Sequence, residues 1–125
     1  MRLLLDTHVV LWELEGSRTV SPAAREAIEE ATDLLFSVVS FAEIGVKVAL
    51  GKLSVPSDLR ELVVQSGVKV LPLEADHGLA VGALPMHHRD PFDRLLIAQA
   101  RREHLTMITA DRRIAAYDVS LVDAG

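Results

Sequence analysis

Short apolar runs alternate with longer helix-forming segments along the whole chain. The apolar runs are typical of buried parallel strands and lie at residues 2–5, 34–38, 68–73, 105–109 and 119–122. The segments between them have the composition and end signals of helices, at residues 9–14, 22–31, 41–50, 57–65, 74–84 and 91–100, with a helical turn at 112–117. Strands that alternate with helices predict an α/β fold, in which helices cover both faces of a parallel sheet of four to five strands.

Capping signals mark where two of these helices begin. Ser21 stands before Pro22, which suits the first turn of a helix because it has no N–H to satisfy. Ser40 and Glu43 have the spacing of a capping box, in which the Glu43 side chain would reach back to the Ser40 amide. This spacing predicts a helix that begins directly after Ser40.

Residues 88–100 carry the most specific pattern in the chain. Pro91 suits the first turn of a helix, and Asp90 directly before it can accept hydrogen bonds from the free amides that follow. Asp90 and Asp93 are three residues apart, so both carboxylates lie on one face of the helix near its N-terminus. By itself this arrangement is explained by Asp90 as a cap, with Asp93 complementing the helix dipole and pairing weakly with Arg94.

Length and composition narrow the class of protein. The 125 residues suit a single domain over residues 1–125, and half of them are apolar with few aromatic side chains. The absence of cysteine excludes disulfides, thiol catalysis and thiolate metal sites. No apolar run approaches the roughly 20 residues that span a bilayer, and Asp6 ends the first run too early for a signal peptide. We therefore expect no membrane association and a cytoplasmic protein.

The net charge of −5 argues against a broad surface that coats nucleic acid. It does not exclude a site in which carboxylates hold metal ions that then meet phosphate, because the charge of the metal must be included there.

Four acidic residues follow strand ends or begin the helices that come next: Asp6, Glu43, Asp93 and Asp111. The carboxyl ends of parallel strands lie at one edge of the sheet, so these side chains can converge. Each also has a local explanation as a cap or dipole partner, and for Asp6 both interpretations stay open. Converging carboxylates without a counter-charge would raise their pKa values and destabilise the fold, whereas Mg²⁺ or Mn²⁺ would remove that conflict.

The histidines offer no better metal site. His8, His87, His88 and His104 lack the spacing of zinc ligands on a helix. We expect these side chains at solvent-exposed or edge positions, outside the chemistry.

Five segments carry a recognisable combination of residues: Leu3-Leu4-Leu5-Asp6-Thr7-His8, Ser40-Phe41-Ala42-Glu43-Ile44, Gly51-Lys52-Leu53, Asp90-Pro91-Phe92-Asp93-Arg94-Leu95-Leu96-Ile97-Ala98-Gln99-Ala100 and Thr109-Ala110-Asp111. In this order they span nearly the whole chain, and the fourth segment is the most specific. The chain resembles PIN-domain proteins, and more closely the VapC-type ribonuclease toxins of VapBC toxin–antitoxin systems.

This resemblance implies a PIN-like three-layer α/β/α sandwich with an acidic pocket for Mg²⁺ or Mn²⁺. It implies that the catalytic acids of the metal site are Asp6, Glu43, Asp93 and Asp111. Thr109 resembles the hydroxyl residue that orients metal-bound water, and Asp90 would be a helix cap first and an accessory ligand second. The implied activity is that of a metal-dependent endoribonuclease, the toxin of a type II toxin–antitoxin system, which hydrolyses RNA phosphodiester bonds by a metal-activated water.

The resemblance also implies a VapB-like antitoxin that blocks the active site, and a homodimer. Apolar residues of the early helices either pack in the core or line a groove for a helix of the antitoxin. These residues are Leu11, Trp12, Leu14, Phe41, Val46 and Leu50.

Arginines gather in the C-terminal half, and their planar donor groups suit RNA phosphates. The candidate RNA-binding residues are Arg89, Arg94, Arg112 and Arg113. Arg94 has the alternative of pairing with Asp90 or another acid of the pocket. Arg101 and Arg102 have the alternative of a solvated face beside Glu103. With few aromatic side chains for stacking on bases, recognition of RNA is expected to depend on shape and backbone.

Two other classes of function are compatible with an α/β fold of this size, a noncatalytic binding protein and a phosphate-handling α/β protein. A PIN-fold protein that binds RNA or a partner without catalysis would keep the acids only as caps, which the presence of all four disfavours. A haloacid-dehalogenase-like phosphatase requires an acid two residues after Asp6, where this chain has His8. A response-regulator receiver requires paired acids near the first strand and a lysine after the last strands, and the sequence lacks both.

Overall fold

A five-stranded parallel sheet forms the centre of the protein in the computed structural model, which describes residues 1–125. The strands are β1 Arg2–Leu5, β2 Asp33–Ser37, β3 Lys69–Leu71, β4 Thr106–Thr109 and β5 Leu121–Asp123. They lie in the order β3-β2-β1-β4-β5, and every neighbouring pair is parallel. The predicted α/β fold is confirmed, and each predicted strand is present with slightly different ends.

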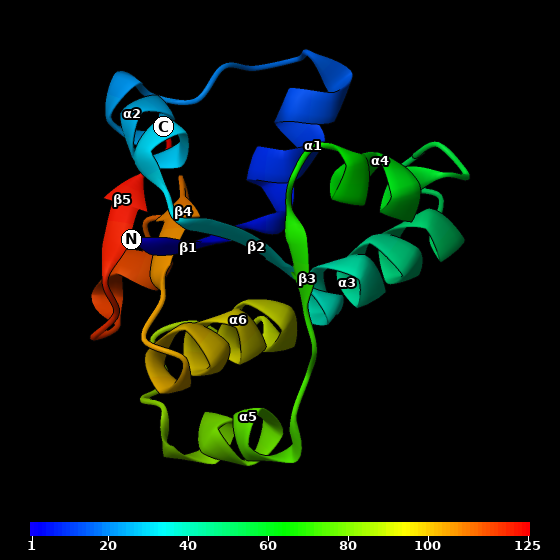
Figure 1. Ribbon diagram of the computed structural model, residues 1–125. Helices are drawn as coiled ribbons and strands as arrows, with labels where there is room; N and C mark the ends of the chain where they lie inside the picture. Colours follow the sequence, from blue (N-terminus) through cyan, green and yellow to red (C-terminus); the bar gives the residue numbers. More distant parts are fainter.

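Helices cover both faces of the sheet, with α1, α2 and α4 on one side and α5 and α6 on the other (Figure 1). The helices are α1 Thr7–Glu15, α2 Pro22–Glu30, α3 Val38–Ala49, α4 Leu59–Gln65, α5 Ala75–Ala80 and α6 Pro91–Arg102, with 3₁₀ turns η1 Val81–Ala83 and η2 Ile114–Ala116. None of the helices is both long enough and apolar enough to span a membrane. The result is the expected three-layer α/β/α sandwich.

The apolar runs are continuous because both faces of the sheet are buried. Successive side chains of a strand point to opposite faces. In β1, Leu3 and Leu5 belong to the core that α1, α2 and α4 cover, whereas Leu4 belongs to the core that α6 covers. Full burial of such a side chain stabilises the fold by about 1.5–3 kcal/mol. This central strand therefore joins the two helical layers.

The start of α3 differs from the prediction. The helix begins at Val38, and the Ser37 hydroxyl accepts a hydrogen bond from the Val39 amide as its N-cap. The predicted capping box is therefore wrong, because Ser40 and Glu43 lie inside the helix. Ser37 caps the helix because β2 ends at this residue, and its hydroxyl also donates to Oε1 of Gln99 in α6 at 2.5 Å.

The carboxyl ends of β1 and β4 lie side by side. Leu5 pairs with Ile108, and the Asp6 amide donates a hydrogen bond to the Ile108 carbonyl oxygen at 3.0 Å. Since all strands run in the same direction, the residues that follow them share one edge of the sheet, which is where α/β proteins bind ligands. Asp6 after β1 and Asp111 after β4 are placed at this edge.

Candidate active site

Acidic side chains from four parts of the chain come together at the carboxyl edge of the sheet. They are Asp6 after β1, Glu43 in α3, Asp90 and Asp93 at the start of α6, and Asp111 after β4. The charges of Asp6, Asp90 and Glu43 all raise the pKa of Asp93, so these four carboxylates are electrostatic neighbours. Asp111 is linked to this group by His88, because the Nε2 atom of His88 lies 3.8 Å from Oδ2 of Asp111.

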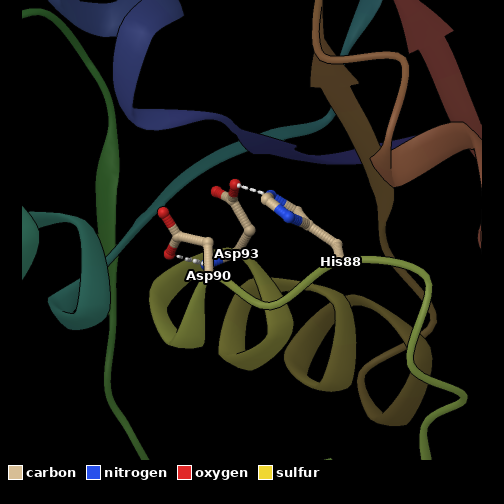
Figure 2. Close-up of side chains that lie close together, drawn as sticks. All are labelled: His88, Asp90 and Asp93. Carbon is tan, nitrogen blue, oxygen red and sulfur yellow. Dashed lines mark hydrogen bonds and ion pairs between the residues drawn. The ribbon is translucent and has the colours of Figure 1, made fainter.

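His88, Asp90 and Asp93 form the tightest part of the cluster (Figure 2). Each of the three offers one ligand atom, and these atoms lie within 4.8 Å of one another. Asp90 Oδ1 accepts hydrogen bonds from the Phe92 and Asp93 amides, at 2.8 and 3.2 Å, which confirms its prediction as the N-cap of α6. The spacing of a metal site is therefore present at the first turn of α6.

Asp93 carries the electrostatic signature of the site. Burial, together with the charges of Asp6, Asp90 and Glu43, raises its pKa from the ordinary 3.8 to about 6, although the hydrogen bond from His88 opposes this shift. The Nε2 atom of His88 lies 2.6 Å from Asp93 Oδ2. Burial and the neighbouring carboxylates disfavour the ionised form of Asp93, and a divalent cation would offset both effects.

Asp6 has a buried oxygen without a partner. The residue is 4% exposed, and burial raises the pKa of its carboxyl group. Its Oδ2 accepts a hydrogen bond from Thr109 Oγ1 at 2.6 Å, but Oδ1 has no partner. Although Asp6 stands at the N-cap position of α1, its side chain caps nothing. A cation would satisfy this oxygen, and the carboxylate oxygens of Asp6, Asp90 and Asp93 suit Mg²⁺ or Mn²⁺, so these residues fit the group that the sequence predicts.

Both oxygens of the Glu43 carboxylate have partners within the chain itself. Its Oε1 lies 2.8 Å from the hydroxyl of Thr7, which lies 2.8 Å from the hydroxyl of Ser40. Its Oε2 accepts a hydrogen bond from Lys47 Nζ at 2.7 Å. Lys47 was missed in the sequence, although its spacing of four residues from Glu43 on one helix is a signal that could have identified it.

Asp111 is likewise held by a cation of its own chain. The Arg113 guanidinium donates to both carboxylate oxygens, with Nε 3.2 Å from Oδ1 and Nη2 3.1 Å from Oδ2. Burial would raise the pKa of Asp111, but these hydrogen bonds lower it overall. Its neighbour Thr109 donates its hydroxyl proton to Asp6 and accepts from the Asp111 amide at 3.1 Å. The roles of Asp111 and Thr109 in catalysis stay predictions.

The expectation for His88 was wrong. It is buried beside Asp93 and Asp111, whereas His8, His87 and His104 are exposed as expected. Its position two residues before Asp90 is the signal that could have placed it in the site. Arg94 donates hydrogen bonds to the backbone of the loop before α6, a contact that no local pattern of the sequence predicts.

Arg94 is buried and binds groups of its own chain. It is 7% exposed, and its guanidinium donates to the hydroxyl of Tyr117 and to carbonyl oxygens of the loop before α6. These oxygens belong to Val81, Leu84, Pro85 and His88. The predicted pairing of Arg94 with an acid is therefore wrong, whereas its role in RNA binding stays a prediction. Its N–H groups are used to fix the loop that carries His88.

The remaining arginines do not form one cluster. Arg89, Arg112 and Arg113 are exposed beside the acids, as an RNA-binding role requires. Arg101 and Arg102 lie in the last turn of α6, whereas the acids lie in its first turn. Because an α-helix rises about 1.5 Å per residue, most of the length of α6 separates these arginines from the acids. Arg102 pairs there with Asp76 of α5 at 3.5 Å. The alternative of a solvated face is therefore the better description of these two residues.

Comparisons with known proteins agree with this architecture. A family model described as PIN domain matches residues 3–120. Ribonuclease VapC22 of Mycobacterium tuberculosis is 31% identical over 122 residues, which cover 92% of this chain and 91% of that relative.

Solved structures share the fold at lower identity. VapBC2 from Rickettsia felis, bound to a DNA fragment from its promoter, has a TM-score of 0.75 at 14% identity and covers 100% of both chains. VapBC-5 from Mycobacterium tuberculosis has a TM-score of 0.66 at 21% identity, with 99% of this chain and 100% of that chain covered. Since the family model spans nearly the whole sequence and the VapC22 match extends along most of both proteins, the chain belongs to the PIN-domain family and is a relative of the VapC ribonucleases.

Proposed function

We propose that this protein is a metal-dependent endoribonuclease and the toxin of a type II toxin–antitoxin system. The observation that carries the proposal is the pair of buried aspartates: Asp6 has an oxygen without a partner, and the pKa of Asp93 is about 6. Both features are those of carboxylates arranged for a cation. The relation to a protein named ribonuclease VapC22 supports RNA as the substrate.

The cation would be held chiefly by Asp6 and Asp93, with Asp90 as an accessory ligand beside them. Glu43 and Asp111 complete the acidic surroundings. When bound, Mg²⁺ or Mn²⁺ supplies the positive charge that activates water and offsets the charge developing on the phosphoryl group.

The chain's own hydroxyl and imidazole groups orient the carboxylates. Thr109 holds Asp6, Thr7 lies at Glu43, and His88 holds Asp93, each within 2.8 Å. All these groups are buried, so water does not compete for their hydrogen bonds. Such preorganisation lets the site bind charge without rearranging first.

RNA would be bound through its phosphates. Arg89 and Arg112 directly adjoin Asp90 and Asp111 in sequence and are exposed, so their guanidinium groups are free to meet a backbone that enters the site. The chain has only three Phe, one Trp and one Tyr, and Tyr117 is buried. A stacking platform for bases is therefore not expected.

A VapB-like antitoxin is the proposed partner, and both act in the cytoplasm where RNA is available. An apolar groove of about 250 Å³ runs between α1 and α4, and Leu11, Leu14, Val55, Pro56, Leu59 and Leu62 are among its lining residues. A helix with an apolar face suits such a groove. The neighbouring VapBC structures, by their names, contain both components of such a system. Homodimerisation stays a prediction from the family resemblance.

Cleavage of RNA by the purified protein tests the proposal. We expect cleavage in Mn²⁺ or Mg²⁺ that is abolished by EDTA, and no cleavage by Asp6→Asn or Asp93→Asn. Asp76→Asn is the matched control, because Asp76 is an exposed aspartate of α5 away from the site. We expect this variant to cleave RNA like the wild type. Full activity of the Asp93→Asn protein would refute the site.

Sequencing of RNA ends after induced expression, with Asp6→Asn as the control, would identify the RNA that is cut. A protein that binds RNA but neither takes up Mn²⁺ nor cleaves would instead be a noncatalytic member of the family.

A further inference from the structure

Lys47 places a fixed positive charge inside the acidic site. Its Nζ lies 2.7 Å from Glu43 Oε2 in α3. This ammonium group therefore pairs with the one carboxylate of the site that α3 contributes.

A helix-stabilising ion pair does not account for this arrangement. Such pairs lie on solvated surfaces, where both partners are exposed and the gain is small. Here the Glu43 side chain is 3% exposed while that of Lys47 is 35% exposed. The lysine thus connects a buried carboxylate of the site with solvent, where a substrate phosphate would arrive.

The five carboxylates of the site divide into two kinds. Glu43 and Asp111 each have a cationic side chain of their own, Lys47 and Arg113. Asp6, Asp90 and Asp93 have no lysine or arginine partner, and the buried Oδ1 of Asp6 has no partner at all. An added cation is therefore needed at Asp6, Asp90 and Asp93, and not at Glu43 or Asp111.

We propose that the site takes up a single divalent cation beside Asp6 and Asp93, and that the Lys47 ammonium group at Glu43 takes the place of a second one and contacts the RNA phosphate. This inference rests on the proposed function. Nucleases with two metal ions use both to offset charge on the phosphoryl oxygens, and an ammonium group can supply part of that charge. Lys47 stays protonated throughout and forms no covalent bond.

The number of Mn²⁺ ions bound per chain, measured by isothermal titration calorimetry on the full-length protein, tests the inference. We expect one equivalent for the wild type and two for Lys47→Met, which keeps the apolar stem but frees Glu43. Lys47→Arg keeps the charge and should stay at one equivalent. Lys69→Met is the matched control, because Lys69 pairs with Asp33 at 2.6 Å at the opposite end of the strands and its loss should leave one equivalent.

RNA cleavage gives a second readout. We expect Lys47→Met to cleave roughly 100-fold more slowly than the wild type at the same Mn²⁺ concentration, with partial recovery in Lys47→Arg. Two equivalents in the wild type, or one equivalent in Lys47→Met whatever its cleavage rate, would overturn the inference while leaving the proposed nuclease intact. A wild type that binds no Mn²⁺ would overturn the proposed function itself.

Discussion

His88 and Asp93 meet at 2.6 Å within the acidic site, between Nε2 of the imidazole and Oδ2 of the carboxylate. The imidazole comes from the loop before α6 and the carboxylate from the first turn of that helix (Figure 2). This contact opposes the rise in the pKa of Asp93 that burial causes, and it leaves the second oxygen of Asp93 for another partner. His88 is therefore a positioning residue for the carboxylate on which the proposed cation depends.

Replacing His88 tests this relationship. We expect His88→Ala to weaken Mn²⁺ binding about tenfold, because partners that orient metal ligands typically contribute 10- to 100-fold in affinity. His87→Ala is the matched control, since His87 is adjacent in sequence but exposed. Calorimetric dissociation constants that are equal for the wild type and His88→Ala would contradict this role.

Arg94 binds the backbone of the loop that carries His88. Lysine cannot supply the fork of donors that Arg94 directs at four backbone carbonyls and Tyr117, so buried acceptors would lose their partners. We expect Arg94→Lys to lower the free energy of unfolding by about 2–4 kcal/mol, measured by urea denaturation. Arg101→Lys, in an exposed position of the same helix, should change it by less than about 0.5 kcal/mol. Equal effects of the two substitutions would show that the Arg94 hydrogen bonds contribute little.

Asp93 makes the stability of the metal-free protein depend on pH. Its pKa is about 6 in the folded protein against 3.8 ordinarily, so the folded state binds a proton more tightly than the unfolded state. The stabilisation from this proton is fully present below about pH 4 and is lost as the pH rises through about 6. At pH 7.5 the ionised group is then a net cost of up to about 3 kcal/mol.

Asp93→Asn removes this ionisation. In EDTA at pH 7.5 we expect it to be more stable than the wild type, and we expect the difference to shrink toward pH 4. Urea denaturation at both pH values measures the change, with the exposed Asp76→Asn as the control. The relation would have the wrong sign if the wild type were the more stable protein at pH 7.5.

The groove between α1 and α4 predicts where the antitoxin binds. Leu14 lines this groove and is 38% exposed, so Leu14→Glu places a charge where an apolar helix face would dock without disturbing the core. We expect about tenfold or greater loss of affinity for the cognate antitoxin, measured by surface plasmon resonance. Leu79→Glu, on α5 across the sheet, should bind normally. If the two variants bound equally well, the antitoxin would have to occupy another surface.

The local sequence was sufficient to predict the elements that carry the aspartates. The consecutive apolar side chains of β1 are stable only when both faces of the strand are buried. The sequence therefore predicts that Asp6 directly follows a buried strand. Pro91 restricts the backbone to the start of a helix, and Asp90 caps it as predicted. Because hydrophobic runs, fixed φ angles and caps act over neighbouring residues, a single sequence determines them.

Tertiary structure decided the partners of the other side chains. Ser37 caps α3 in place of Ser40, and Glu43 inside this helix lies beside Thr7, 36 residues away in sequence. Arg94 donates hydrogen bonds both to Tyr117, 23 residues later, and to the carbonyl oxygen of His88. Hydrogen bonds over such separations form only after the sheet and helices have packed, and the spacing of residues along the chain does not encode them.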